Sequence, residues 1–216
     1  MSKLWVFGDS WTYTEDVTNS WGKRIADDLG FEYINLADVG LSNERILFNL
    51  LDTLPKIQKG DIVFLQTSYN YRFNYHNNSS FPPSGNTTNY NHNGFWYSSL
   101  WEQTMRECGI WNNLDIISDY HNKTINPLTS AYFQKLGVLL SSMGCIPIHI
   151  PIEKWVGYYS NWIPLGWNGY DNFQQIINDV MKDDDEIGDS HIKLPGHSVI
   201  YERLLPQFKE IVNNYQ

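Results

Sequence analysis

Residues 4–10 read LWVFGDS, an apolar run that stops abruptly at a glycine. Four apolar residues in succession, two of them aromatic and one β-branched, are typical of a strand buried on both faces of a parallel sheet. Gly8 allows the chain to turn sharply after this strand, and Ser10 follows just beyond the turn. Open α/β sheets hold ligands at the carboxyl ends of their strands. The stretch therefore predicts a serine hydroxyl at that edge, although an ordinary turn is also rich in Asp and Ser.

The rest of the chain alternates between strand and helix patterns, which favours a parallel sheet with helices on both faces. Further strands are expected at 31–36, 61–65 and 146–150. Asn19 or Ser20 can cap a helix that ends at Gly30, and Ser42 can cap a helix that ends at Pro55. A further helix is expected at 128–143. The last element, at about 195–215, is expected to be a helix or a helix pair that bends near Pro206. Pro147 cannot donate to a strand ladder, so the strand at 146–150 is expected to be short.

We therefore expect a single domain over residues 1–216, with a three-layer α/β/α architecture of flavodoxin-like type and a central parallel sheet of about five strands. Two stretches depart from the alternating pattern and are expected to be loop insertions over one end of the sheet, at about 69–125 and 152–171. Their high aromatic content argues against disorder.

Composition and charge exclude several classes of function. The formal net charge of -9 argues against nucleic-acid binding and against binding to anionic membranes. No apolar run reaches the length of a membrane span, and the first residues lack a signal-peptide pattern, so we expect a cytoplasmic protein. Cys108 and Cys145 are too few for a disulfide framework. The histidines lack the paired spacing of a metal site, and we expect no metal or other cofactor.

A second chemical signal lies near the C-terminus, where residues 189–197 read DSHIKLPGH. Asp189 precedes His191 by two residues, directly ahead of the last expected helix. A serine, a histidine and an aspartate can act as a nucleophile, its general base and the group that orients the base. The orienting acid could instead be Asp185 or Glu186 in the preceding acidic run, and His191 could be an ordinary turn residue.

Together these segments resemble the sequence blocks of the SGNH, or GDSL-type, hydrolases. The sequence GDS at 8–10 matches the first block, Gly40 in the loop after the second strand matches the second block, and Asp189 with His191 matches the last. The resemblance covers both ends of the chain and the first 70 residues, whereas the middle resembles nothing specific. It implies an SGNH-hydrolase fold and a serine ester hydrolase with the catalytic residues Ser10, Asp189 and His191.

The chain departs from the family in two places. The family usually has Gly-x-Asn-Asp after the third strand, whereas this chain has QTSYNY at 66–71. The resemblance implies an oxyanion hole made by the backbone N–H groups of Ser10 and Gly40 and the side chain of Asn70. The alternative side-chain donors are Gln66, Thr67 and Ser68. The family also commonly places two residues between the catalytic acid and base, and here only one intervenes.

The aromatic insertions point to a substrate class. Trp155, Trp162 and Trp167 are candidate substrate-binding residues, because flat rings with a polar edge suit sugar rings or acyl chains. Arg72 could meet an anionic substrate group or form an ordinary surface ion pair. We expect a serine esterase of carboxylic esters, with O-acetyl groups of carbohydrates as the preferred substrate.

Other functions remain open at this point. One is a lipase or thioesterase that acts on small acyl esters, and another is a catalytically inactive carbohydrate-binding protein on the same scaffold. A nucleotide-binding protein is disfavoured, because the chain has no glycine loop that could cradle phosphates. The sequence gives no indication of the oligomeric state.

Overall fold

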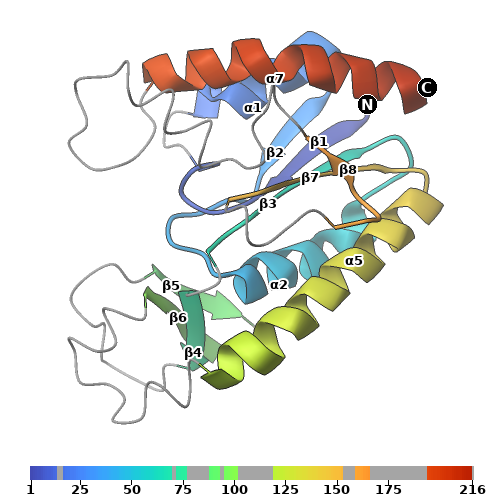
Figure 1. The fold of residues 1–216 in the computed structure, drawn as a ribbon. Helices are drawn as coiled ribbons and strands as arrows, with labels where there is room; N and C mark the ends of the chain where they lie inside the picture. The colour runs from blue at the N-terminus through green and yellow to red at the C-terminus, as the bar shows by residue number, and fades with distance from the viewer. Residues whose placement is uncertain are drawn as a thin grey trace.

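A five-stranded parallel sheet forms the centre of the computed structural model (Figure 1). Its strands are β1 (Lys3–Phe7), β2 (Glu32–Asn35), β3 (Ile62–Thr67), β7 (Ile146–Pro151) and β8 (Ile163–Pro164), and their order in the sheet is β2-β1-β3-β7-β8. The structure describes residues 1–13, 17–69, 72–76, 88–92, 95–101, 119–152, 159–165 and 194–215.

Helices cover both faces of this sheet, which confirms the expected three-layer α/β/α class (Figure 1). One layer contains α1 (Trp21–Leu29) and α7 (Leu194–Tyr215), and the other contains α2 (Asn43–Thr53) and α5 (Asn126–Ser142). Single turns of 3-10 helix lie at Val17–Asn19 and Leu54–Lys56, and a π-helix at His121–Ile125 leads into α5.

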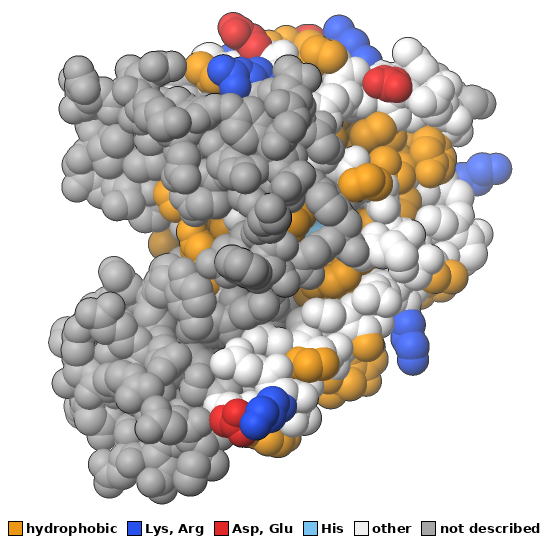
Figure 2. Space-filling model, in the orientation of Figure 1, with side chains coloured by type: hydrophobic (Ala, Val, Ile, Leu, Met, Phe, Trp, Pro, Cys, Tyr) orange, Lys and Arg blue, Asp and Glu red, His pale blue; other side chains and the backbone are white. Residues whose placement is uncertain are grey.

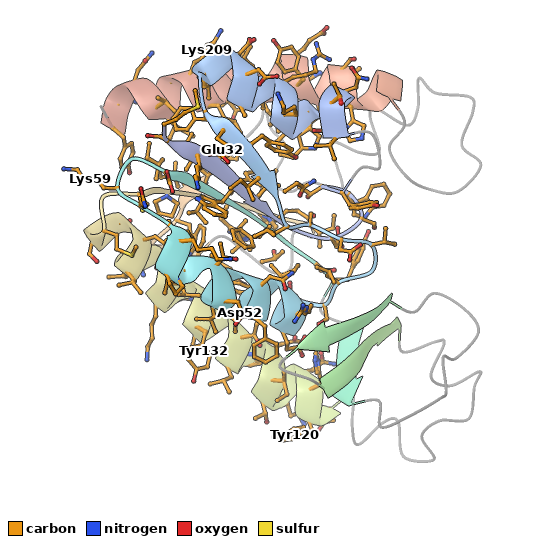
Figure 3. The ribbon with its side chains drawn as sticks, turned by 180° about the vertical axis from the view of Figure 1, so that it is seen from behind. Glu32, Asp52, Lys59, Tyr120, Tyr132 and Lys209 are labelled. Atoms are coloured by element: carbon orange, nitrogen blue, oxygen red, sulfur yellow. The ribbon has the colours of Figure 1, made fainter. Side chains whose placement is uncertain are left out.

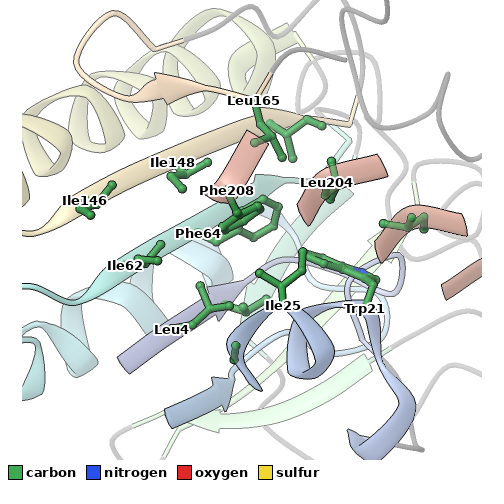
Figure 4. Close-up of a cluster of buried hydrophobic side chains, with 14 of the residues drawn as sticks. Leu4, Trp21, Ile25, Ile62, Phe64, Ile146, Ile148, Leu165, Leu204 and Phe208 are labelled. Carbon is green, nitrogen blue, oxygen red and sulfur yellow. The ribbon is translucent and has the colours of Figure 1, made fainter. Parts of the chain in front are cut away.

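The apolar side chains of each strand alternate between two cores. On β1, Leu4 and Val6 belong to the core under α1 and α7, whereas Trp5 and Phe7 belong to the core under α2 and α5. Figure 4 shows the first core, where Phe64 of β3 packs against Phe208 of α7 with their ring centroids 6.0 Å apart. The buried residues 4–7 therefore contribute side chains to both cores, as their continuous apolar pattern predicts.

The first two helices begin and end where the sequence predicts. The Ser20 hydroxyl caps α1 by accepting a hydrogen bond from the Lys23 N–H, and Gly30 ends the helix with φ 73°. The Ser42 hydroxyl caps α2 in the same way, and Pro55 lies in the 3-10 turn that follows the helix. α7 is a single helix of 22 residues that contains Pro206.

The strand β7 is longer than expected, because Pro147 is accommodated within it. β7 has six residues, and Pro147 pairs with Val63 in the middle of the sheet. The N–H of Ile146 donates toward the β3 side, to the Asp61 carbonyl, so the nitrogen of the next residue points away from β3. β8 pairs with β7 only from Ile148 onward, and Pro147 therefore leaves no ladder bond unmade. The prediction of a short strand was wrong.

Parts of both expected insertions form strands. In the first, β4 (Arg72–His76), β5 (Thr88–His92) and β6 (Phe95–Trp101) make a three-stranded antiparallel sheet, and β4 contacts α2. In the second, Ile163 and Pro164 form the edge strand β8 of the main sheet.

The surface of the described residues carries scattered charges. On the face shown in Figure 2, the described Lys and Arg side chains are dispersed rather than gathered into a basic patch. Among the described helices, none is both long and apolar enough to cross a bilayer. The outer face of α5 carries Tyr132, which is about half exposed and points away from the sheet (Figure 3).

The inner face of α5 packs closely against residues 159–165. The indole N–H of Trp162 donates a hydrogen bond of 2.7 Å to the Phe133 carbonyl on α5. A Cβ atom at Gly137 would lie 2.5 Å from Trp162 Nε1 and 2.6 Å from the Asn161 carbonyl oxygen. The helix can therefore approach this segment only because position 137 has no side chain.

A histidine lies fully buried beneath the same segment. The His149 ring on β7 stacks on Tyr159 with ring centroids 4.4 Å apart, and its Nε2 lies 3.3 Å from the Thr67 hydroxyl. Burial lowers the pKa of His149 to about 3, because a charged imidazole would lose its hydration there. His149 is therefore neutral in the folded protein at neutral pH.

We predict that Gly137→Ala destabilises the protein. In a solvent-exposed helix, a change from glycine to alanine instead stabilises the helix by about 0.5–1 kcal/mol. The added methyl group would clash with Trp162 and Asn161, and overpacking of this kind costs about 1–3 kcal/mol. Thermal unfolding would show a lower Tm for Gly137→Ala, with the exposed Ser141→Ala on the same helix as the control. An unchanged or higher Tm for Gly137→Ala would contradict the close contact.

We also predict that acid destabilises the fold through His149. The unfolded chain takes up this proton near pH 6.5 and the native protein only near pH 3, so stability is complete above pH 6.5 and falls as the pH drops toward 3. At pH 5 the loss from this group is about 2 kcal/mol. Urea unfolding at pH 7.5 and 5.0 should show a smaller pH effect for His149→Phe, which cannot titrate. An equal effect in both proteins would contradict the prediction.

Candidate active site

The turn after β1 brings Ser10 to the carboxyl edge of the sheet. The carbonyl oxygen of Asp9 accepts hydrogen bonds of 3.0 Å from the N–H groups of both Thr12 and Tyr13, which closes a single helix-like turn around Ser10. Ser10 is 6% exposed. Its hydroxyl is thus held on a short, internally bonded turn at the end of a buried strand.

The side chain of Gln66 at the end of β3 fixes this turn. Its Oε1 accepts a hydrogen bond of 3.1 Å from the Asp9 N–H and one of 2.6 Å from the Thr12 hydroxyl. A Cβ atom at Gly8 would lie 2.6 Å from the Thr12 hydroxyl oxygen and 2.7 Å from Gln66 Oε1. With a larger residue at position 8, the Gln66 and Thr12 side chains would therefore have to move, and their hydrogen bond would be disturbed.

The site lies at the point where the strand order reverses. β1 is followed by α1 on one face of the sheet, and β3 is preceded by α2 on the other face. The helices that flank β1 and β3 therefore diverge at the carboxyl edge between these two strands. In open parallel sheets, this switch point is where ligands bind.

The loop after β2 is brought to the same edge. The N–H of Leu36 donates to the Val6 carbonyl at 2.8 Å, and the N–H of Asp38 donates to the Gly8 carbonyl at 3.4 Å. Gly40 follows with φ 74°, a conformation that favours glycine, and Ser42 then begins α2. The loop that carries Gly40 is thus tied directly to the Ser10 turn.

A fork of hydrogen bonds joins the start of α2 to the end of β3. The Asn43 side chain accepts from the Ser68 N–H at 2.7 Å and donates to the Ser68 carbonyl at 2.9 Å. The Ser68 hydroxyl in turn donates to the Asp9 carboxylate at 2.7 Å. Three segments, those after β1, β2 and β3, are therefore linked through buried polar groups.

The three alternative oxyanion donors all have internal partners. The Gln66 amide nitrogen donates to the Thr67 carbonyl at 2.8 Å, the Thr67 hydroxyl pairs with His149, and the Ser68 hydroxyl donates to Asp9. All three residues are fully buried.

Several expected site residues lie outside the described residues. They are Asn70, Trp155, Trp167, Asp185, Glu186, Asp189 and His191. Arg72 is the first residue of β4, and the structure describes its backbone only. α7 begins at Leu194, and its start lies at the carboxyl edge of the sheet (Figure 1).

Trp162 does not lie where its expected role requires. It is 4% exposed, belongs to the core under α2 and α5, and its indole N–H is bonded to the Phe133 carbonyl. A buried ring of this kind has no face available to a substrate, so we correct the expectation that Trp162 binds one.

Sequence reasoning overlooked Asn43 as a structural link and treated Gln66 only as a possible donor. The available signal was a polar residue in an otherwise buried position: Asn43 follows the helix cap, and Gln66 continues an apolar strand. Within the part of the chain that the structure describes, no group of three or more His, Cys, Asp or Glu residues could hold a metal ion.

Known proteins offer a structural likeness but no sequence match. No protein-family model matches the sequence, and a search of curated proteins finds no match. The chain is similar to a solved structure from Desulfitobacterium hafniense DCB-2, named a "putative lipolytic protein of G-D-S-L family". The TM-score is 0.49 at 12% sequence identity, and the match covers 94% of this chain and 97% of the other. The likeness is distant, and the strand order shows an α/β protein.

Proposed function

We propose that this protein is a serine hydrolase of carboxylic esters in which Ser10 is the nucleophile. The observation that carries the proposal is the position of Ser10, on a bonded turn at the switch point between β1 and β3. A nucleophile needs a fixed position relative to its base and its oxyanion donors. The contacts of Gln66 with Asp9 and Thr12 supply that rigidity.

The oxyanion hole would consist of the backbone N–H groups of Ser10 and Gly40 and the side chain of Asn70. The bond between Asp38 and Gly8 supports this arrangement, because it holds the Gly40 loop beside the Ser10 turn. The internal bonding of Gln66, Thr67 and Ser68 favours Asn70 as the side-chain donor over any of them. Each such donor typically contributes about 10²–10³ in rate.

His191 would act as the general base, oriented by Asp189. Support comes from α7, which begins three residues after His191 in the sequence and starts at the edge of the sheet that carries Ser10 (Figure 1). The neighbouring helix α1 lies beside it, with the Arg24 guanidinium donating to the Ser198 hydroxyl at 2.9 Å. Asp189 is favoured over Asp185 and Glu186, since acids in a charged run repel one another and favour solvated positions.

The reaction would proceed in two halves. His191 accepts the proton of the Ser10 hydroxyl while the Ser10 oxygen attacks the ester carbonyl. The oxyanion donors stabilise the tetrahedral intermediate that forms. His191 then gives the proton to the leaving alcohol, which leaves an acyl group on Ser10. Water, activated by the same histidine, attacks this acyl-enzyme and releases the acid.

We further propose O-acetyl groups of carbohydrates as the preferred substrate. The support is the sequence composition of the two insertions, where Trp155 and Trp167 supply rings for stacking and Arg72 supplies a cation. A comparison of kcat/KM on an acetylated oligosaccharide and on p-nitrophenyl butyrate would separate this class from small acyl esters.

We predict that Ser10→Ala and His191→Ala each lower kcat on p-nitrophenyl acetate by at least about 10³-fold. Asp189→Asn should lower it by up to about 10⁴-fold, because the imidazole would adopt the wrong tautomer. Steady-state kinetics would measure these effects, with circular dichroism to verify folding. Ser142 is exposed on α5, and Ser142→Ala is the control that should keep wild-type activity. Near-wild-type turnover by folded Ser10→Ala would contradict the proposal.

A further inference from the structure

A chain of buried hydrogen bonds runs from the start of α2 to the Ser10 turn. It begins with the two bonds between the Asn43 side chain and the Ser68 backbone, at 2.7 and 2.9 Å. It continues with the bond of 2.7 Å from the Ser68 hydroxyl to one Asp9 carboxylate oxygen, while the other oxygen accepts from the Trp11 N–H at 3.2 Å. Asp9 and Ser68 are fully buried.

Because these hydrogen bonds are buried, they restrict the position of Asp9. A carboxylate that loses a hydrogen bond inside a protein cannot recover it from water, so Asp9 is held where the Ser68 hydroxyl and the Trp11 N–H meet it. Because Asp9 and Trp11 flank Ser10 in the sequence, the same bonds restrain the backbone on both sides of the serine. Ser68 thus restrains the turn that carries the Ser10 hydroxyl.

Ser68 also restrains the loop that carries Gly40. Asn43 follows Gly40 by three residues and is the first residue of α2, so the fork onto the Ser68 backbone fixes the end of that loop. A single residue at the end of β3 therefore contacts the segments that carry both Ser10 and Gly40.

We infer that Ser68 is a positioning residue for the reaction at Ser10, acting through Asp9 and Asn43 and not by contact with substrate. The inference rests on the proposed function. A serine hydroxyl has one hydrogen to donate, and Ser68 donates it to Asp9. Ser68 is consequently distinct from an oxyanion donor, which must aim its hydrogen at the substrate.

The inference predicts a loss in kcat rather than in binding. Ser68→Ala should lower kcat on p-nitrophenyl acetate, and the rate of inactivation by a fluorophosphonate, by about 10²-fold, which is the typical cost of a small misplacement. KM should change little, and Ser68→Thr should restore much of the rate because it restores the hydroxyl. Thr53→Ala is the matched control: it removes a hydroxyl from a buried residue at the far end of α2 and should leave kcat unchanged.

A double-mutant cycle with Asp9→Ala separates positioning from direct catalysis. If Ser68 acts through Asp9, the double variant is no slower than Asp9→Ala alone. Additive losses would instead assign the Ser68 hydroxyl to the reacting atoms and overturn the inference, as would full activity of Ser68→Ala. If a variant of the cycle does not fold, Asp9→Asn tests the same bond while it preserves shape: a lower kcat at unchanged KM supports the inference, and an unchanged kcat overturns it.

Assays of the wild-type protein separate failure of the proposed function from failure of the inference about Ser68. If the wild type neither turns over esters nor reacts with the fluorophosphonate, the proposed function fails and the inference fails with it. If the wild type is active and Ser68→Ala is equally active, only the inference fails.

Discussion

The candidate site depends on one interaction, the pair of hydrogen bonds that the Gln66 side chain accepts from the Asp9 N–H and the Thr12 hydroxyl. These bonds join the end of β3 to the turn after β1, and a side chain at position 8 would crowd both Gln66 and Thr12. The turn is also fastened to the sheet through the Asp9 carboxylate, through the Asp38 N–H, and through the Asn35 side chain, which donates to the Thr12 carbonyl at 3.4 Å. Gln66 is buried, so water cannot replace its contacts if this side chain is removed.

The parallel topology explains why the other site segments meet at this turn. Three adjacent strands, β2, β1 and β3, end at the same edge of the sheet, and each is followed by a segment that holds polar groups. Hydrogen bonds between backbone groups and buried side chains link these segments, whereas apolar packing holds the layers below. The neutral His149 stacks on Tyr159 and contacts the Thr67 hydroxyl, so it joins this packed layer to the end of β3.

Local sequence signals predicted much of the fold. The caps at Ser20 and Ser42, the helix end at Gly30 and the buried run of β1 depend on neighbouring residues and are visible in sequence. The edge strand β8 and the burial of Trp162 depend on contacts with β7 and α5, which no local pattern reveals. The same holds for the site: a glycine, an aspartate and a serine mark the turn, but its bonds to Gln66 and Ser68 join residues more than fifty positions apart.

The most direct test of the account is to locate the residue that reacts with a fluorophosphonate. Intact-mass spectrometry followed by peptide mapping would measure both the number of adducts and their position. The account predicts one adduct per chain, on Ser10, and none after the protein is unfolded in urea before labelling. An adduct on another serine, such as Ser42, or no adduct on the folded protein would contradict it.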